Sequence, residues 1–329
     1  MNIIKLHHPY NQEQIFPGPI VLALGFFDGV HRGHQAVINT AKKIANEKKI
    51  PLAVMTFNQH PKIIYHQLDP EEVTYLTLLD RKVELLSALE VDVLYLIDYT
   101  LEFGTQSPQE FVDRYIVDLG AVTVVAGFDY TYGKQELANM KTLPEHAKGR
   151  FDVIEVPELK NNNLKVGTTN IKDLLANNQI EIANEELGYL YQTSGMVVHG
   201  DKRGRTIGYP TANVQINPQE VLPSVGVYVC EIEVDGKWYQ GMASIGYNIT
   251  FEANRQKTCE VYILDFEQDI YGHFVKVRWH HYLRGEMKFD GIKGLIHQLD
   301  QDLINTKTYF EQLAQQSTIP DNEKVKDDE

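Results

Sequence analysis

The segment that most constrains the fold is the glycine-rich stretch 25–34, GFFDGVHRGH. It follows five apolar residues, 20–24, and precedes a segment in which apolar side chains recur every three or four residues. This order predicts a strand, a tight turn and a helix. Glycines let the backbone approach a ligand closely, and the first N–H groups and the dipole of a helix favour an anion. We therefore expect a phosphate site at this turn.

Two histidines close the turn, His31 and His34. Imidazoles three residues apart can donate hydrogen bonds to oxygens that gain charge during transfer at phosphorus, so the turn is a candidate nucleotidyl-transfer site. A metal site is a weaker interpretation, because no cysteine lies nearby and no carboxylate follows at the zincin spacing. A purely structural turn is a stronger alternative than a metal, but it would leave the histidine spacing as a coincidence.

The string Gly-Phe-Phe-Asp-Gly-Val-His-x-Gly-His resembles the FMN adenylyltransferase module of bacterial FAD synthetases, within the HxGH nucleotidyltransferase superfamily. The resemblance implies that His31 and His34 stabilise charge on the phosphates of ATP. It implies an ATP-binding role for five further residues of the turn: Gly25, Phe27, Asp28, Gly29 and Gly33. It also implies flavin contacts for Asn58 and His60, which follow the next apolar strand.

Strands alternate with helices through the first half of the chain, which predicts an α/β domain with a parallel sheet and ligands at the carboxyl ends of the strands. The expected strands after the turn are 52–57, 93–97, 122–126 and 153–156. The expected helices are 80–89, a capped helix from Ser107 to Gly120 with Glu110 closing the capping box, and 171–187.

Two glycine-containing segments follow later strands. The segment 127–134 is not a P-loop, because five residues separate its glycines and Gln135 stands where Ser or Thr is needed. It is similar to the family's Gly-x-Asp-x-x-x-Gly element, which contacts flavin and nucleotide, and this implies a flavin contact for Asp129. The segment 167–172 corresponds by position to the Ser-Ser-Thr-x-x-Arg motif that binds triphosphate. The resemblance implies phosphate contacts for Thr168 and Thr169 and a catalytic role for Lys172, which would neutralise the leaving pyrophosphate. Lys172 stands where the family usually has Arg, and its ammonium lacks the planar fork of a guanidinium.

The second half has a different character. From Gly195 onward, short β-rich runs alternate with glycine and polar turns, which predicts a small antiparallel barrel. A helix is expected from about Asp290 to Leu313, and the charged tail from Pro320 is expected to be disordered. Since 329 residues suffice for two cores, we expect domains at 1–186 and 187–316, with an acidic tail at 317–329.

The stretch 200–213 packs three glycines and three cations before Thr211 and Asn213. Glycines allow a loop to fold over phosphates, and cations offset charge in an acidic protein. Thr211 and Asn213 share a face if the chain is extended there, and they offer neutral oxygens to Mg²⁺. An ordinary basic surface loop is the alternative interpretation.

Gly-Tyr-Pro-Thr-Ala-Asn at 208–213 is similar to the signature of riboflavin kinases, and the resemblance continues to residue 289. It implies Mg²⁺ binding by Thr211 and Asn213, a catalytic base in Glu260 and a flavin contact for Arg284. It implies phosphate contacts for Gly200, Lys202, Gly204, Arg205 and Gly208. On the residues alone, Glu260 alternates with apolar neighbours and could equally be the exposed face of a strand. Ile249 and Tyr262 depart from the family pattern, which commonly has Pro and His there.

The charge and cysteine content limit the possible partners. A net charge of −14 argues against a nucleic-acid surface. Two distant cysteines indicate reduced residues, the N-terminus lacks the apolar region of a signal peptide, and no apolar run approaches the ~20 residues of a membrane helix, so we expect a cytoplasmic protein without membrane contact.

Both resemblances together imply FAD biosynthesis, in which riboflavin and MgATP give FMN, and FMN and MgATP give FAD and pyrophosphate. Two alternatives stay open at this point. One is an enzyme with only one of these activities, and the other is a non-catalytic flavin-binding regulator.

Overall fold

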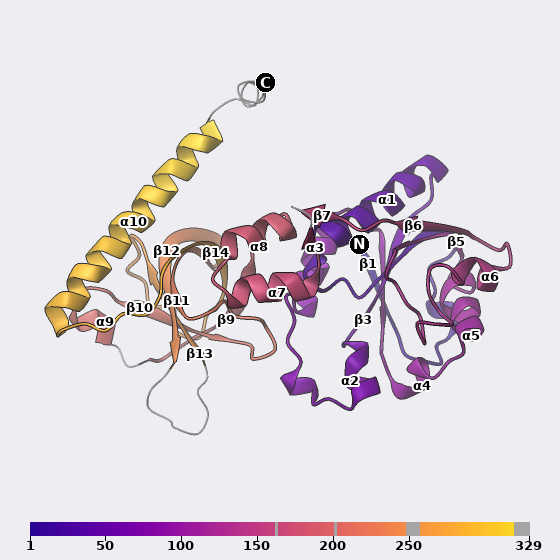
Figure 1. The fold of residues 1–329 in the computed structure, drawn as a ribbon, viewed down its shortest axis with the longest axis horizontal. Coiled ribbons are helices and arrows are strands. Elements are labelled where there is room, and N and C mark those ends of the chain that lie inside the picture. The colour runs from indigo at the N-terminus through magenta and orange to yellow at the C-terminus, as the bar shows by residue number, and fades with distance from the viewer. Residues whose placement is uncertain (162–163, 201–202, 248–256, 319–329) are drawn as a thin grey trace. The chain divides into compact units, whose positions relative to one another are not determined.

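The computed structural model describes residues 1–161, 164–200, 203–247 and 257–318 (Figure 1). The chain divides into two compact units. The N-terminal unit comprises Met1–Lys172, Glu186–Gly188 and Pro218–Glu220; the C-terminal unit comprises Asp173–Glu185, Tyr189–Asn217 and Val221–Glu329. No helix in the described part of the chain is long and apolar enough to cross a membrane.

The N-terminal unit is built on a six-stranded parallel sheet with the order β1-β4-β3-β2-β5-β6. Its strands are β1 (Asn2–Leu6), β2 (Ile20–Leu24), β3 (Leu52–Phe57), β4 (Val93–Ile97), β5 (Ala121–Gly127) and β6 (Asp152–Val156). The chain runs outward from β2 through β3 to β4 and then returns to place β5 on the other side of β2. The carboxyl ends of β2 and β5 therefore form the topological switch point, where open parallel sheets bind ligands.

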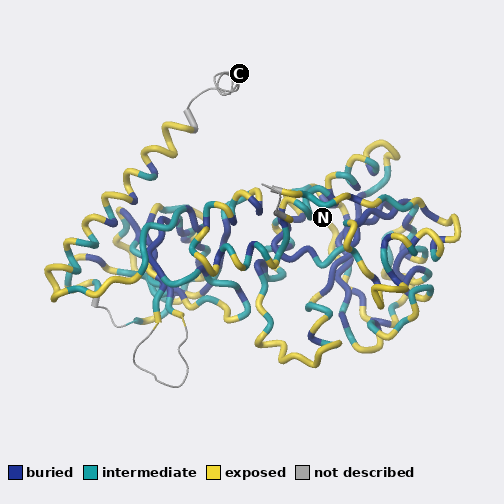
Figure 2. Tube along the Cα trace, viewed as in Figure 1, coloured by how far each residue is buried: buried dark blue, intermediate teal, exposed yellow. Residues whose placement is uncertain are grey.

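Helices cover the sheet. They are α1 (Arg32–Lys48), α2 (Pro61–His66), α3 (Leu79–Ala88), α4 (Leu101–Gly104), α5 (Pro108–Val112) and α6 (Leu143–Ala147). Strands β2, β3 and β4 are buried along their whole length, which Figure 2 shows in dark blue. Side chains alternate between the two faces of β2, so Val21 packs in one core cluster with Ile38 of α1, while Leu22 packs in a second cluster with Phe111 of α5.

Two predicted helices differ from expectation in their details. The Ser107 capping box with Glu110 is confirmed, but α5 ends at Val112 and continues as a π-helical turn, Asp113–Val117. The single helix expected at 171–187 is wrong, because two helices form instead: α7 (Thr168–Ala176) and α8 (Ile180–Leu187). Asn178 between them has a φ of 60°, a left-handed conformation that Asn tolerates, and its side chain accepts a hydrogen bond of 2.7 Å from the Tyr228 hydroxyl.

The C-terminal unit is a closed antiparallel barrel with the order β10-β13-β12-β11-β14-β9, as predicted in kind. Its strands are β9 (Gln192–Val198), β10 (Thr211–Ile216), β11 (Gly226–Val234), β12 (Lys237–Tyr247), β13 (Lys257–Ile263) and β14 (Phe274–Arg284). Sequence reasoning named neither β10, which lies inside the polar motif, nor β12, which glycine and polar residues interrupt.

The expected C-terminal helix is confirmed as α10 (Ile292–Thr318), drawn in yellow in Figure 1. A short helix, α9 (Arg203–Thr206), precedes β10, and a small hairpin, β7 (Lys160–Asn161) with β8 (Leu164–Lys165), belongs to the N-terminal unit. Cys230 and Cys259 are buried free thiols, and burial raises the pKa of Cys259 to about 12. The predictions for Lys202, Ile249 and the tail from residue 319 lie outside the described residues.

Candidate active sites

The turn after β2 adopts a shape that only glycine permits at two positions. Gly29 has a φ of 78°, and a Cβ there would lie 2.7 Å from Leu76 Cδ1. A Cβ on Gly25 would lie 2.7 Å from Phe27 Cζ, and Phe27 itself has a left-handed φ of 54°. The folded-back Phe27 thus occupies the space that a side chain at residue 25 would need. This compact turn brings His31 to the start of α1.

His31 and His34 form a stacked pair at the amino end of α1. Their ring centroids are 3.6 Å apart with an interplanar angle of 19°, and the His34 backbone N–H donates to His31 Nδ1 at 3.3 Å. A Cβ on Gly33 would lie only 3.2 Å from that same nitrogen. His31 is therefore the side-chain cap of the helix, a role that the spacing predicted only as a helix start.

Burial lowers the pKa of His31 to about 4 and that of His34 well below its usual value. Both rings are therefore neutral at pH 7. Because Nδ1 of His31 accepts a hydrogen bond, its proton resides on Nε2, which is free to donate. Nδ1 of His34 is buried and has no hydrogen-bond partner among the residues that the structure describes.

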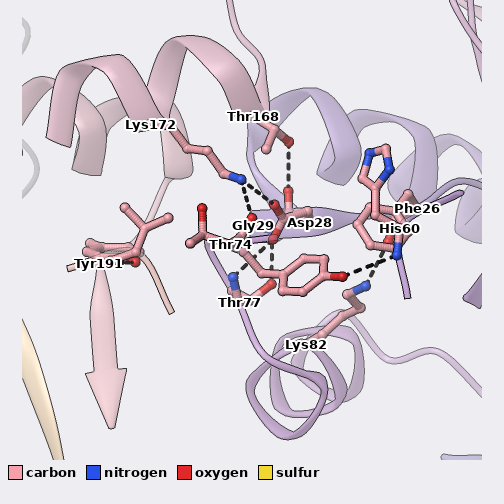
Figure 3. A network of polar contacts seen from close by, with 12 residues as sticks. Phe26, Asp28, Gly29, His60, Thr74, Thr77, Lys82, Thr168, Lys172 and Tyr191 are labelled. Carbon is pink, nitrogen blue, oxygen red and sulfur yellow. Dashed lines mark hydrogen bonds and ion pairs between the residues drawn. The ribbon is translucent and has the colours of Figure 1, made fainter. Parts of the chain in front are cut away.

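A cavity of about 360 Å³ opens beside the turn. It brings together seven of the residues predicted from the sequence: Phe27, Asp28, His34, His60, Thr168, Thr169 and Lys172. These residues come from the turn, the start of α2 and the start of α7. The helix start at Thr168 is tied to the turn because the Thr168 hydroxyl donates to the Asp28 carbonyl at 3.1 Å (Figure 3).

Asp28 organises the floor of this cavity. Its carboxylate is 4% exposed, and Oδ1 accepts a hydrogen bond of 3.0 Å from the Thr77 N–H. The Thr77 hydroxyl in turn accepts from the Gly29 N–H at 2.9 Å. Lys172 Nζ lies 3.8 Å from Asp28 Oδ2 and donates to the Thr74 carbonyl, as Figure 3 shows. Burial raises the pKa of Asp28, and the nearby Lys172 opposes that shift.

Sequence reasoning missed Lys82 on α3. Its side chain is buried, and Nζ donates to the Phe26 carbonyl at 2.8 Å and lies 4.2 Å from the centre of the Phe26 ring (Figure 3). Burial lowers the pKa of this ammonium to about 8. The signal that could have revealed it is its position: Lys82 lies one helical turn before the buried Leu86 and therefore on the apolar face of α3.

Two predicted flavin contacts do not line the cavity. Asn58 links the ends of β3 and β4, since its Oδ1 accepts from the Tyr99 N–H at 2.9 Å and its Nδ2 donates to Asp98 at 3.1 Å. Asp129 forms an ion pair of 2.6 Å with Lys165. Both lie at carboxyl strand ends as expected, but their roles toward substrate stay predictions.

The barrel brings four predicted residues together at the pairing of β10 with β13. Asn213 lies opposite Glu260 in the register, and the Thr211 hydroxyl donates to Glu260 Oε2 at 3.1 Å. Gly200 packs directly on Asn213, because a Cβ there would lie 2.4 Å from the carboxamide. Thr211 and Asn213 do share one face of an extended strand. The arrangement gathers hydroxyl, amide and carboxylate oxygens at one point.

The described part of the glycine-rich loop, residues 203–210, is called the glycine loop below. Gly204 lies against Tyr209, and a Cβ on Gly204 would lie 2.1 Å from the Tyr209 carbonyl oxygen. Gly208 has a φ of 89°, so the left-handed region explains a second glycine. Arg205 is exposed on α9.

Arg284, at the end of β14, is held by α10. Its Nε and Nη2 donate to the Asp302 carboxylate at 3.0 and 2.7 Å, and its Nη1 donates to the Gly285 carbonyl at 2.9 Å. Asp302 is 1% exposed. The structure thus gives Arg284 a partner within the protein, and its predicted contact with flavin stays a prediction.

The first site combines neutral imidazole donors, a buried cation and a helix start. The second combines oxygen ligands with a carboxylate. Both sets of groups suit transfer at phosphorus. The two units therefore define a two-domain transferase of phosphate groups. Residues 13–170 match the family model described as FAD synthetase, and residues 187–310 match the one described as riboflavin kinase. The chain belongs to the bifunctional riboflavin kinase/FMN adenylyltransferase family, whose activities make FAD from riboflavin, as the resemblance implied.

Individual relatives agree along nearly the whole chain. The chain is 46% identical to the bifunctional riboflavin kinase/FMN adenylyltransferase of Listeria monocytogenes over 313 residues, which cover 95% of this chain and 99% of that one. It is 42% identical to the Bacillus subtilis protein of the same name, over 95% of this chain and 99% of that one. A solved structure titled macrolide-efflux protein from Streptococcus pneumoniae matches with a TM-score of 0.85 and 37% identity, over 92% of this chain and 99% of that one. This likeness covers the folds of both units.

Proposed function

We propose that the C-terminal barrel phosphorylates riboflavin to FMN and that the N-terminal unit adenylylates FMN to FAD, with the site residues described above. The observation that carries the proposal is the stacked His31–His34 pair, which lies at the switch point of the sheet beside a cavity that Lys172 also lines. The domain ranges that we propose for the two activities, 1–186 and 187–316, contain the family-model limits 13–170 and 187–310. The structure groups Asp173–Glu185, between those limits, with the barrel.

In the adenylylation, an oxygen of the FMN phosphate attacks the α-phosphorus of ATP. The new P–O bond forms as the bond to the bridging oxygen of pyrophosphate breaks. The FMN phosphate is itself the nucleophile, so no covalent enzyme intermediate is needed. Positioning and charge stabilisation then supply most of the catalysis, as is usual for transfer at phosphorus.

The residues of the turn have the required donors. His31 presents Nε2–H as a neutral donor, and His34 packs against it with a buried Nδ1 that a ligand group could satisfy. Lys172 lies near a carboxylate and a carbonyl, and its ammonium can turn to the leaving pyrophosphate and neutralise its charge. The rings of Phe26 and His60 pack edge to face, with their centroids 4.9 Å apart. Both line the cavity, so together they form an aromatic wall for the flavin.

In the kinase reaction, Glu260 accepts the proton of the riboflavin 5′-hydroxyl. The hydroxyl oxygen attacks the γ-phosphorus of ATP, and ADP leaves. Glu260 is already oriented by the Thr211 hydroxyl at 3.1 Å. The carboxylate lies on the strand beside the glycine loop, where a phosphate chain would be bound. A base held in place in this way matches the positioning role of carboxylates in phosphoryl transfer.

The residues at the pairing of β10 with β13 also fit Mg²⁺. When bound, this ion would neutralise charge on the phosphates of ATP. Thr211 and Asn213 would hold it, since both offer the hard oxygen ligands that Mg²⁺ prefers. Within the described residues, no group of three or more His, Cys, Asp and Glu side chains could hold a metal ion. That agrees with an ion bound largely through phosphate and water oxygens, as Mg²⁺ commonly is.

The test is a chromatographic time course of the purified protein with riboflavin, ATP and Mg²⁺, run with oxidised and with dithionite-reduced flavin. We expect FMN to appear first and FAD after it. FMN alone would show a single-activity kinase, and FAD formed only from added FMN would show a single-activity adenylyltransferase. No product from riboflavin or from added FMN, with either the oxidised or the reduced flavin, would favour the regulator and overturn the proposal.

A further inference from the structure

The helix α10 carries a buried carboxylate that is fully engaged with the barrel. Asp302 accepts hydrogen bonds from Nε and Nη2 of Arg284 and one of 2.9 Å from Gln298 Nε2. Its backbone carbonyl accepts from the Thr306 hydroxyl at 2.8 Å. Because a carboxylate that is only 1% exposed needs such partners, Asp302 is built to hold Arg284.

A second carboxylate on α10 reaches the glycine loop. The Tyr209 hydroxyl donates a hydrogen bond to Asp300 Oδ1. Tyr209 is 8% exposed, and burial together with the Asp300 charge raises the pKa of the phenol, so it stays protonated and donates. The carboxylate therefore has a permanent donor in the loop.

Tyr209 is the residue through which this link controls the loop. Its backbone N–H donates to the Gly204 carbonyl at 2.9 Å, and its carbonyl oxygen packs against Gly204. Its ring lies 5.1 Å from that of Tyr262, which pairs with Thr211 in the β10–β13 register. A displacement of Tyr209 therefore moves both the loop and the backbone that leads into Thr211.

The two links leave the helix on different sides. Residues two apart on an α-helix point about 200° apart. Asp300 faces the glycine loop that precedes β10, and Asp302 faces the end of β14; the two elements are distant in sequence. In Figure 1 the short helix α9 of this loop lies beside the first turns of α10. The helix α10 thus contacts both the glycine loop, through Asp300, and the end of β14, through Asp302.

We propose that α10 positions the kinase site, with Asp300 and Asp302 as positioning residues for the glycine loop and for Arg284. This rests on the proposed kinase function of the barrel. Neither carboxylate needs to touch substrate. Loss of the Tyr209–Asp300 link frees the loop, so the apparent affinity for ATP falls while Glu260 keeps its place.

The test compares Tyr209→Phe, Asp300→Ala and the double variant in riboflavin phosphorylation, with KM measured for ATP and for riboflavin. We expect each single variant to raise the KM for ATP about tenfold, the effect of one hydrogen bond to a charged group. The KM for riboflavin should change less than twofold. The double variant should be no worse than either single variant, because all three remove the same interaction.

Two controls separate positioning from general damage, and a third variant tests Asp302. Adenylylation of added FMN by the same preparations reports the other unit and should be unchanged. Glu311→Gln alters an exposed carboxylate on the same helix and should match the wild type. Asp302→Asn should raise the KM for riboflavin; if it unfolds the barrel, the Tyr209–Asp300 pair still decides the question.

An unchanged KM for ATP, or additive effects of Tyr209→Phe and Asp300→Ala, would overturn the proposal. Equal losses of both activities would overturn it too, because the effect would then be global. A wild-type protein without kinase activity refutes the proposed function instead, which keeps the two failures distinct.

Discussion

Replacing Lys82 with Met should stabilise the N-terminal unit at neutral pH while it weakens adenylylation. Lys82 is 3% exposed, and among the described residues its Nζ donates one hydrogen bond, to the Phe26 carbonyl. That carbonyl also accepts a hydrogen bond of 2.8 Å from the Thr56 hydroxyl, so it stays satisfied in the variant. Met fills similar space without the charge, and replacing a buried charge by an apolar side chain is often neutral or stabilising.

The magnitude follows from the pKa. Burial lowers the pKa of Lys82 from 10.5 to about 8, which corresponds to a cost of about 3 kcal/mol for keeping the ammonium charged in the folded state. The unfolded chain binds more protons than the folded one between these two pH values. The free energy of unfolding of the wild type therefore rises with pH from about 8 to 10.5, and the cost is fully present below pH 8.

Lys82→Met lacks this titration. We expect its free energy of unfolding to exceed that of the wild type by up to about 3 kcal/mol at pH 7, and the difference to vanish toward pH 10.5. Adenylylation should fall about tenfold or more, because the Phe26 wall loses a charge-assisted hydrogen bond and the cavity loses a nearby cation.

Urea denaturation can follow the two units separately. Both tryptophans, Trp238 and Trp279, belong to the C-terminal unit, so their fluorescence reports the barrel, and far-ultraviolet circular dichroism adds the N-terminal unit. Lys43→Met, at an exposed position on α1, is the matched control and should leave the pH profile unchanged. A Lys82→Met protein less stable than the wild type at pH 7, with a difference that does not shrink toward pH 10.5, would refute the reasoning. Unchanged adenylylation would refute the functional part.

Three further variants test the two sites and the turn. His34→Ala should lower FAD formation from added FMN about 10²- to 10³-fold, the usual cost of losing one preorganised donor, and leave riboflavin phosphorylation intact; intact FAD formation would remove the histidine from the mechanism. Glu260→Gln should lower FMN formation about 10²- to 10⁴-fold, as expected for a lost general base, while added FMN is still adenylylated; normal FMN formation would exclude the base role. Gly25→Ala places a Cβ 2.7 Å from Phe27 Cζ and should destabilise the N-terminal unit by about 1 to 3 kcal/mol, measured by urea denaturation; wild-type stability would show that Phe27 can move aside.

Some helix boundaries could be predicted from the sequence because the residues that cap them are close together in the chain. Pro108 at the first helical position and the Ser107–Glu110 capping box satisfy backbone groups within four residues, and the structure has both. The break at Asn178 was not readable in the same way. The apolar pattern runs on across it, and the left-handed residue is secured by Tyr228, fifty residues later in the chain.

The sequence predicted which residues belong to the candidate sites better than it predicted how those residues are arranged. The glycine and histidine pattern indicated which residues of 25–34 belong together, and the period of two indicated that Thr211 and Asn213 share a face. Asn58 follows a strand end, as flavin contacts were expected to do, yet it serves to join two strands. Nothing in the spacing distinguishes a side chain that faces a cavity from one that faces a neighbouring strand.

The sequence by itself determined the strand–turn–helix at the first site, the barrel, and both phosphate-transfer motifs. These depend on glycine conformations, side-chain periodicity and residue chemistry over short stretches. Only the tertiary structure decided that His31 is neutral, that Lys82 is a buried cation, and that Asp302 holds Arg284. Each of these depends on burial and on partners brought together by strand order and by the docking of helices, because the cost of a buried charge and the reach of a hydrogen bond are set by neighbours in space.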